Sequence, residues 1–146
     1  MARYKETVPS ARSQQDTFDY LARFSNTSEW DPGAKRGRDL QEGGPVAVGS
    51  RFSLDFAIAG KTTELLYEVV EYDRPGRVRL TADAGWFTSD DLIVVEPRGD
   101  ASAVTYDADV RLKGPLKLFD PIMKLGFKRA GDKAAGGLRE TLGRRV

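Results

Sequence analysis

The residues best suited to chemistry in this sequence are a carboxylate and a hydroxyl two positions apart, Asp91 and Ser89. Ile93 and Val95 continue the same spacing, and side chains two residues apart point to one face of a β-strand. An unbroken strand would therefore place Asp91 and Ser89 on an apolar face. A carboxylate there needs a raised pKa or a polar partner, which suits an acid, a base or a polar anchor for a ligand. Alternatively, Asp90 and Asp91 mark the start of the strand, and a bulge or loop leaves both in water.

Two tyrosines are further candidates, because Tyr67 and Tyr106 could each offer a phenol to a hydroxyl or carbonyl group of a ligand. A core tyrosine with a satisfied hydroxyl is the alternative for both. If the protein is an enzyme, Asp91 and Tyr106 are the candidate catalytic residues.

The 146-residue chain contains no histidine and no cysteine. These absences exclude Ser-His-Asp and Cys-His catalysis, disulfides, and metal sites built on histidine or cysteine. The aspartates form no spacing typical of a metal site, and the glycine pairs at 43–44 and 136–137 lack the Lys-Ser/Thr of a phosphate-binding loop. We therefore expect no metal and no cofactor. This repertoire is narrow for an enzyme and adequate for a binding protein.

The net charge of +1 is an average of two opposed segments. Residues 1–110 carry 13 basic and 19 acidic side chains, whereas residues 111–146 carry 10 basic and 3 acidic ones. A basic tail can contact nucleic acid, anionic lipid or an acidic ligand, or it can simply be the solvated face of a helix. Aromatic residues do not alternate with these basic ones, so we expect no nucleic-acid partner.

The length predicts one domain over residues 1–146, as a monomer or a homodimer. No stretch of 18 residues is free of charge, so we expect no integral membrane association. Residues 1–6 lack the apolar run of a signal peptide, which makes a cytoplasmic location the default expectation.

The first elements that would position the candidates are a strand and a helix. Residues 3–8 form a candidate strand that Pro9 would end, and Ser13 with Asp16 resembles a capping box that opens a helix. A further helical turn can follow around Trp30, and the glycine-rich, polar stretch 32–50 is expected to be a loop.

From Arg51 the hydrophobic period changes to two, which is typical of half-buried strands. Short turns such as 73–76 and 97–100 separate the successive strands, so we expect an antiparallel meander. The expected strands cover residues 51–58, 62–72, 77–82, 89–96 and 104–112.

The last third predicts a long helix over about 121–143, because apolar residues recur there every three or four positions. Each glycine within this helix costs roughly 1 kcal/mol relative to alanine. Gly126, Gly131, Gly136 and Gly137 therefore indicate either close backbone approach to a sheet or room for a ligand.

Several local strings occur in a recognisable order along nearly the whole chain. They are Phe18-Asp19-Tyr20-Leu21-Ala22, Trp30-Asp31-Pro32-Gly33, Val48-Gly49-Ser50-Arg51-Phe52, Tyr67-Glu68-Val69-Val70-Glu71-Tyr72-Asp73-Arg74-Pro75, Glu96-Pro97-Arg98-Gly99-Asp100, Val104-Thr105-Tyr106, Gly114-Pro115-Leu116 and Asp120-Pro121. Together they resemble the START-like (SRPBCC) superfamily, in its polyketide cyclase/dehydrase branch.

The resemblance implies an α+β helix-grip fold. A curved antiparallel sheet would wrap around the long C-terminal helix, with short helices after the first strand and an apolar cavity between sheet and helix. It is not specific for activity, because one fold hosts many functions.

Side chains alternate between the two faces of each strand, and apolar residues form one stripe along the predicted helix. These two patterns select the residues that could face such a cavity, although each could equally be a plain core residue. These candidate ligand-binding residues are Phe52, Leu54, Phe56, Tyr67, Ser89, Asp91, Ile93, Tyr106, Ala108, Phe119, Met123, Phe127 and Ala130. Trp30 and Trp86 join them as lid candidates, since loops near such positions border the cavity mouth in the family that the chain resembles. Trp86 could equally be the tip of a hairpin.

Three functions remain open from the sequence. The first is binding, and possibly transport or sequestration, of a hydrophobic small molecule or lipid. The second is a polyketide cyclase, aromatase or dehydratase-like enzyme that uses an Asp/Tyr-lined pocket. The third is peripheral membrane or protein interaction through the basic C-terminal helix.

Overall fold

A computed structural model describes residues 2–58 and 60–144, apart from the side chains of residues 119, 120, 122 and 123. Its elements follow in the order β1 (Ala2–Ser10), α1 (Gln14–Ala22), η1 (Phe24–Asn26), α2 (Thr27–Trp30), β2 (Ala34–Asp39), β3 (Arg51–Ile58), β4 (Lys61–Asp73), β5 (Arg77–Asp83), β6 (Phe87–Arg98), β7 (Ala101–Leu112), η2 (Gly114–Phe119) and α3 (Asp120–Leu142).

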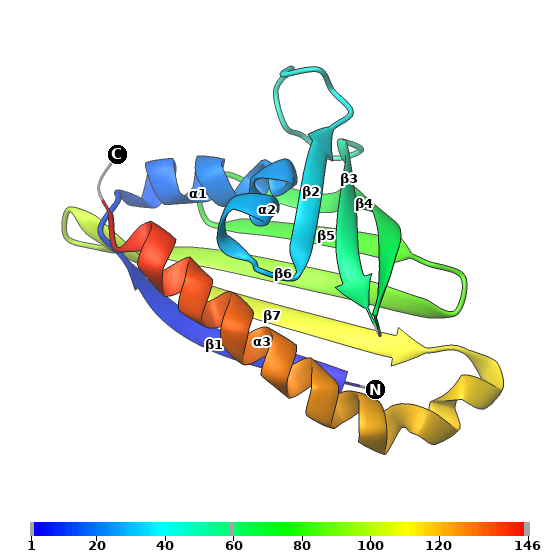
Figure 1. Ribbon diagram of the computed structural model, residues 1–146. Helices are drawn as coiled ribbons and strands as arrows, with labels where there is room; N and C mark the ends of the chain where they lie inside the picture. The colour runs from blue at the N-terminus through cyan, green and yellow to red at the C-terminus, as the bar shows by residue number, and fades with distance from the viewer. Residues whose placement is uncertain (1, 59, 145–146) are drawn as a thin grey trace.

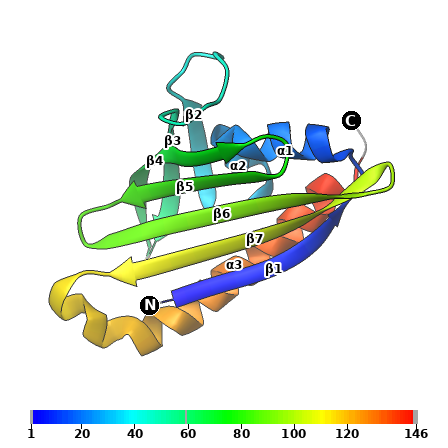
Figure 2. The same cartoon turned by 180° about the vertical axis from the view of Figure 1, so that it is seen from behind.

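Within the described residues, seven strands form one antiparallel sheet in the order β1-β7-β6-β5-β4-β3-β2. Strands β3 to β7 are sequential neighbours, which confirms the predicted meander, and β1 returns to pair with β7. The sheet curves around α3, and α1 and α2 pack near the C-terminal end of that helix, as Figures 1 and 2 show. This arrangement is the predicted helix-grip α+β fold.

Alternation along the strands divides the sheet into an inner and an outer face. On β6, Phe87, Ser89, Asp91, Ile93 and Val95 are buried, while the residues between them are only partly so. Because a strand alternates its side chains strictly, this pattern places the buried series on the inner face.

Two expectations about the sheet edges are wrong. Pro9 does not end β1, since the strand continues to Ser10 and Pro9 lies opposite Ala103. A proline is tolerated there because β1 is an edge strand, where a missing N–H leaves no partner unpaired. The expected loop 32–50 contains β2, the other edge strand, which pairs with β3. Its polar composition is typical of edge strands that avoid pairing with other chains, and it gives no apolar alternation from which a strand could be predicted.

The start of α1 is capped as expected. The backbone N–H of Asp16 donates to the Ser13 hydroxyl at 3.1 Å. The helix buries Phe18 and Leu21, and Phe18 packs edge-on against Tyr72 at a centroid distance of 5.5 Å. This short helix therefore fills one end of the inner face with solid core.

Helix α3 packs on the sheet mainly through its C-terminal half. Leu138 and Leu142 are buried, whereas Phe127 and Ala134 are only partly buried and Leu125 is exposed. The end of the helix is also tied to the chain after β1, where Ala11 donates its N–H to the Leu142 carbonyl at 2.8 Å. The apolar stripe of α3 is therefore in full contact with the core at one end only.

Candidate functional site

A cavity of about 630 Å³ lies between the sheet and α3, and the α3 residues that line it extend from Gly126 to Leu138. Its wall combines α3 side chains such as Phe127 and Ala134 with strand residues such as Phe56, Leu65 and Val110. Trp30, at the end of α2, contributes to the same wall. Most of the lining is apolar, as is usual for a small-molecule site.

The cavity wall includes most of the residues that the sequence singled out. Those in the wall are Trp30, Phe56, Tyr67, Trp86, Ser89, Asp91, Tyr106, Ala108, Phe127 and Ala130. The side chains of Phe119 and Met123 lie outside the described residues.

Phe52, Leu54 and Ile93 lie on the inner face of the sheet, as predicted, but they belong to the packed core and have no exposed surface. The reason is their place along the strands. β3 contacts η1 and β6 contacts α1, so these parts of the inner face are covered by short helices instead of by α3. Parity gives the face of a strand, and only the packing decides which part of that face borders the cavity.

Sequence reasoning missed a larger part of the wall. The missed wall residues are Tyr4, Glu6, Val8, Thr27, Asp31, Gly33, Ala57, Ile58, Leu65, Phe87, Val110, Leu112, Leu116, Ala134, Ala135 and Leu138. The alternation of Tyr4, Glu6 and Val8 was a usable signal, but the pairing of β1 with β7 was needed to show which way it faces.

A chain of hydrogen-bonded polar groups lies in the part of the cavity wall that the sheet forms. The Tyr67 hydroxyl bonds to Ser89 Oγ at 3.1 Å, and Ser89 Oγ donates to Asp91 Oδ1 at 2.9 Å. The Tyr106 hydroxyl donates a hydrogen bond to Asp91 Oδ2. These groups come from three strands. Asp91 and Tyr106 meet because Asp91 lies opposite Ala108, next to the Ile93–Tyr106 pair.

The structure supports the inward orientation of Asp91. The β6 strand is continuous through this position, so Asp91 is buried and the side chain of Asp90 points to the outer face, where it forms an ion pair with Arg79 at 3.4 Å. A bulge that leaves both aspartates in water is excluded by this register.

Burial raises the pKa of Asp91 to about 6. The hydrogen bonds from Tyr106 and Ser89 act in the opposite direction, because they stabilise the charged form, while the nearby charges of Asp90 and Asp31 add to the increase. A carboxyl group with this pKa exchanges its proton near neutral pH. Asp91 can therefore act as an acid, as a base or as an anchor for a polar group.

Two other carboxyl groups belong to the wall. Burial raises the pKa of Asp31, although Asp31 Oδ1 accepts a hydrogen bond from the Gly33 N–H at 2.8 Å. Glu6 forms an ion pair with Arg139 of α3 at 3.3 Å.

Two of the α3 glycines allow close backbone approach, and a third leaves space. A Cβ atom on Gly137 would lie 1.9 Å from the Trp30 carbonyl oxygen, and one on Gly131 would lie 2.4 Å from the Tyr4 ring. A Cβ atom on Gly126, which lines the cavity, would meet nothing within 4 Å. Both interpretations of these glycines therefore apply, each at different positions.

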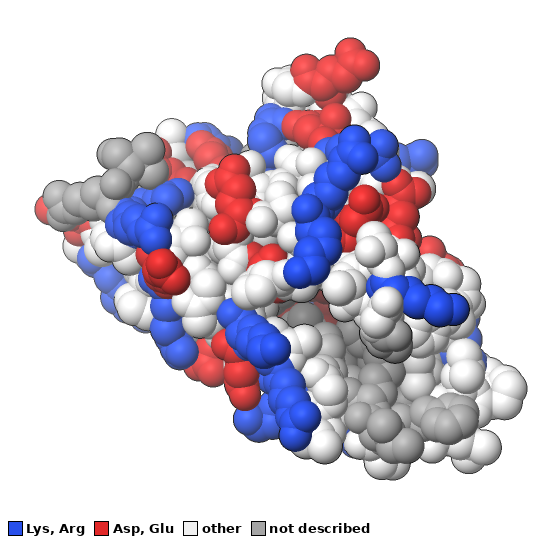
Figure 3. Space-filling model, viewed as in Figure 1, with Lys and Arg blue, Asp and Glu red and all other residues white. Residues whose placement is uncertain are grey.

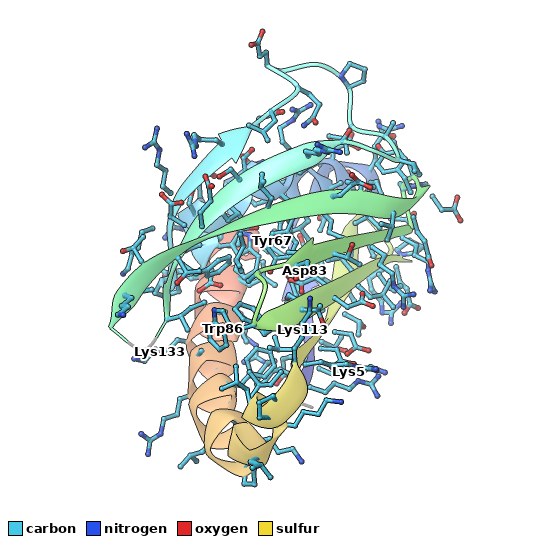
Figure 4. The ribbon with its side chains drawn as sticks, turned by 90° about the vertical axis from the view of Figure 1, so that its right-hand side faces the viewer. Lys5, Tyr67, Asp83, Trp86, Lys113 and Lys133 are labelled. Carbon is cyan, nitrogen blue, oxygen red and sulfur yellow. The ribbon has the colours of Figure 1, made fainter. Side chains whose placement is uncertain are left out.

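The two tryptophans differ in position. Trp30 is buried and packs edge-on against Tyr106 at a centroid distance of 5.6 Å, so it forms part of the inner wall. Trp86 is 39% exposed and lies at the tip of the β5–β6 hairpin beside α3, where Figure 4 shows it. Trp86 thus combines the two alternatives, as a hairpin tip that also lines the cavity.

Among the side chains that the structure describes, no three acidic groups converge into a possible metal site. Among the described helices, none is long and apolar enough to cross a bilayer.

Comparison with solved structures supports the fold. The chain is similar to a START superfamily protein from Mycobacterium smegmatis, with 20% identity, a TM-score of 0.77 and 97% of each chain covered. It is also similar to a protein from Thermus thermophilus, with 16% identity, a TM-score of 0.74, and 97% of this chain and 95% of that chain covered. A polyketide cyclase-like protein from Corynebacterium glutamicum has 18% identity and a TM-score of 0.54, with 96% of this chain and 86% of that chain covered.

Comparison with curated protein sequences gives no match. The family model described as polyketide cyclase/dehydrase and lipid transport matches residues 1–143. Fold, cavity and family match agree, and the chain belongs to the polyketide cyclase/dehydrase and lipid transport family.

Proposed function

We propose that this protein binds a hydrophobic small molecule or lipid in the cavity between the sheet and α3, and thereby carries or sequesters it. The observation that supports this function best is the cavity itself, with its volume of about 630 Å³ and its mostly apolar wall. Small-molecule sites usually have such a volume and such a lining. The lipid-transport part of the family description agrees with this function.

The wall provides enough apolar surface for useful affinity. Each methylene group that leaves water contributes about 0.8 kcal/mol. A chain of about ten such groups would gain about 8 kcal/mol before the cost of association is subtracted. A gain of about 8 kcal/mol corresponds to a dissociation constant of about 1 μM, so after the cost of association ligands of that size are expected to bind more weakly than about 1 μM.

Two experiments test this function: identification of the molecule that the protein carries, and a substitution whose side chain fills the cavity. Native mass spectrometry of protein purified from cells should show a bound apolar molecule. Ala134→Trp should abolish this binding, because Ala134 lines the cavity and the indole would occupy it. Lys133→Trp is the matched control, since Lys133 is an exposed neighbour on the same helix (Figure 4). Equal ligand content in both variants would contradict the proposed site.

A second candidate function is a cyclase or dehydratase-type enzyme, and the buried Asp91 supports it. A carboxyl group with a pKa of about 6 next to the Tyr106 phenol can accept a proton from carbon and return it to oxygen. The test is incubation with poly-β-ketone thioester analogues, followed by mass spectrometry for a product that has lost water. Turnover that Asp91→Asn abolishes would support the enzyme, and a lack of turnover by the wild-type protein would count against it.

The third hypothesis, contact with a membrane surface, rests on the outer face of α3. Exposed basic side chains gather along this helix, as Figure 3 shows, and they include Lys124, Lys128, Arg129 and Lys133. Part of this charge is balanced within the protein, because Lys128 pairs with Asp132 and Arg139 pairs with Glu6.

A further inference from the structure

The ionisable groups in the cavity wall have one sign of charge. Glu6, Asp31 and Asp91 line the cavity, and among the described lining residues there is no lysine or arginine. A site with this lining repels an anionic group and attracts a cation, and the effect is strong where water is excluded.

Asp91 is the carboxyl group without a counter-charge. Its two hydrogen-bond donors, Ser89 and Tyr106, are neutral hydroxyls, and within the described residues no lysine or arginine forms an ion pair with it. The nearby charges that influence it, on Asp90 and Asp31, are also negative. A buried carboxylate is costly unless a cation pairs with it, so this position favours a positive group from outside the protein.

The other two carboxyl groups have partial compensation. Glu6 has an ion pair with Arg139, and Asp31 accepts the Gly33 N–H and is influenced by the charge of Lys35. The deficit of positive charge is therefore greatest at Asp91.

Asp91 also has acceptor sites to spare. Each carboxylate oxygen can accept about two hydrogen bonds, and the protein supplies one to Oδ1 and one to Oδ2. Aromatic rings stand close by, since Tyr106 packs against Trp30 and both line the cavity. An ammonium group offers several N–H donors and is attracted to aromatic faces.

From this arrangement we propose that the ligand is a cationic amphiphile, with an apolar body that fills the cavity and a protonated amine that pairs with Asp91. The proposal rests on the proposed binding function and specifies its ligand class. The same wall would exclude fatty acids and other ligands that carry a buried anion, because two negative groups would meet without a cation between them.

The test compares three probes that share one apolar chain and differ only in the head group: dodecylamine, dodecanol and dodecanoate. Binding to the wild-type protein would be measured at neutral pH, below the concentrations at which the probes form micelles. Calorimetry gives the affinity, and the fluorescence of Trp30 and Trp86 reports occupancy, since both residues line the cavity. We expect the amine to bind most tightly, by about tenfold or more over the alcohol, and the carboxylate to bind most weakly.

Asp91→Asn should remove the preference for the amine while the alcohol continues to bind. Glu96→Gln is the matched control, because Glu96 lies on the same strand but is exposed to solvent, and it should keep the preference. The order of the three head groups is measured on the wild-type protein, so the proposal remains testable even if Asp91→Asn does not fold.

The outcomes separate the two proposals. If none of the three probes binds, both the apolar binding function and the ligand class fail. If the probes bind with equal affinity, or if dodecanoate binds most tightly, the cavity binds apolar molecules but the cationic ligand class is wrong. A preference for the amine that survives in Asp91→Asn would also overturn the role of Asp91.

Discussion

Asp91 shows how the surroundings of one residue change its chemistry. Its carboxyl group would titrate near pH 3.8 in water, and burial in an apolar wall raises its pKa to about 6. Ser89 and Tyr106 limit this increase, because both donate hydrogen bonds that stabilise the charged form. The result is a buried group that is mostly ionised at neutral pH and protonated in mild acid.

This shift predicts how Asp91 affects stability as the pH changes. Because the pKa is higher in the folded than in the unfolded protein, the folded state binds more protons between pH 3.8 and about 6. The stabilising contribution of Asp91 is therefore fully present below pH 3.8 and is lost as the pH rises through about 6. We expect the free energy of unfolding of wild type relative to Asp91→Asn to increase by about 2 to 3 kcal/mol between about pH 7 and about pH 4.

Chemical denaturation of both proteins across this pH range provides the measurement. Asp107→Asn is a control of opposite sign, because the hydrogen bonds and charge of Arg3 hold the pKa of Asp107 below its usual value. Relative to that variant, the wild type should lose stability as the pH falls. A difference between wild type and Asp91→Asn that does not vary with pH would mean that Asp91 is not the buried titrating group described above.

At the scale of single elements, α3 determines the cavity because it touches the fold closely at some positions and separates from it at others. Gly137 sits against the carbonyl of Trp30, where a side chain would displace the helix from α2. The adjacent Gly136 is exposed, and a Cβ atom there would meet nothing within 4 Å. Substitutions at these two neighbouring positions therefore distinguish the effect of close packing on stability from the effect of helix propensity.

Alanine substitutions at the two positions should therefore have opposite effects. Gly137→Ala is expected to destabilise the protein by about 1 to 3 kcal/mol, because the overlap with Trp30 outweighs the gain in helix propensity. Gly136→Ala is expected to stabilise it by up to about 1 kcal/mol. Thermal and denaturant unfolding would measure both, and a Gly137→Ala variant as stable as Gly136→Ala would disprove the close contact.

Across the whole molecule, exposed apolar residues accompany basic ones at the end where α3 begins. Leu118 is 84% exposed and Leu125 is 59% exposed, and the neighbouring Lys117 and Lys124 are also exposed. Leu116 and Gly126, close to them in the chain, line the cavity. An apolar ligand that enters or leaves at this end would pass a surface suited to anionic lipid.

We therefore predict that the protein binds vesicles that contain phosphatidylserine more tightly than vesicles of phosphatidylcholine alone. Each lysine near an anionic surface contributes about 1 kcal/mol, so Lys124→Gln should weaken binding about fivefold, and added salt should weaken it further. Lys61→Gln, an exposed lysine on the sheet, is the control. Cosedimentation that is independent of lipid charge and salt would contradict this prediction.

Much of the fold and part of the cavity wall could be predicted from the chain alone. The change of period at Arg51 indicated the meander, and the apolar stripe after residue 120 indicated the long helix, because such patterns depend only on local geometry. The alternation around Asp91 made an inward orientation one of two alternatives, and the continuous β6 strand decided between them. The edge strand β2 was missed because a solvated edge has no apolar face to produce a pattern.

What only the tertiary structure decided is where the inner face is filled and where it is hollow. Phe52 and Phe56 have the same parity, yet Phe52 is solid core and Phe56 lines the cavity. No local pattern distinguishes them, since the difference arises from which helix covers each part of the sheet. The partners of Asp91 were undetermined for the same reason. Tyr106 reaches Asp91 directly and Tyr67 reaches it only through Ser89, and register between distant strands is a property of the assembled sheet.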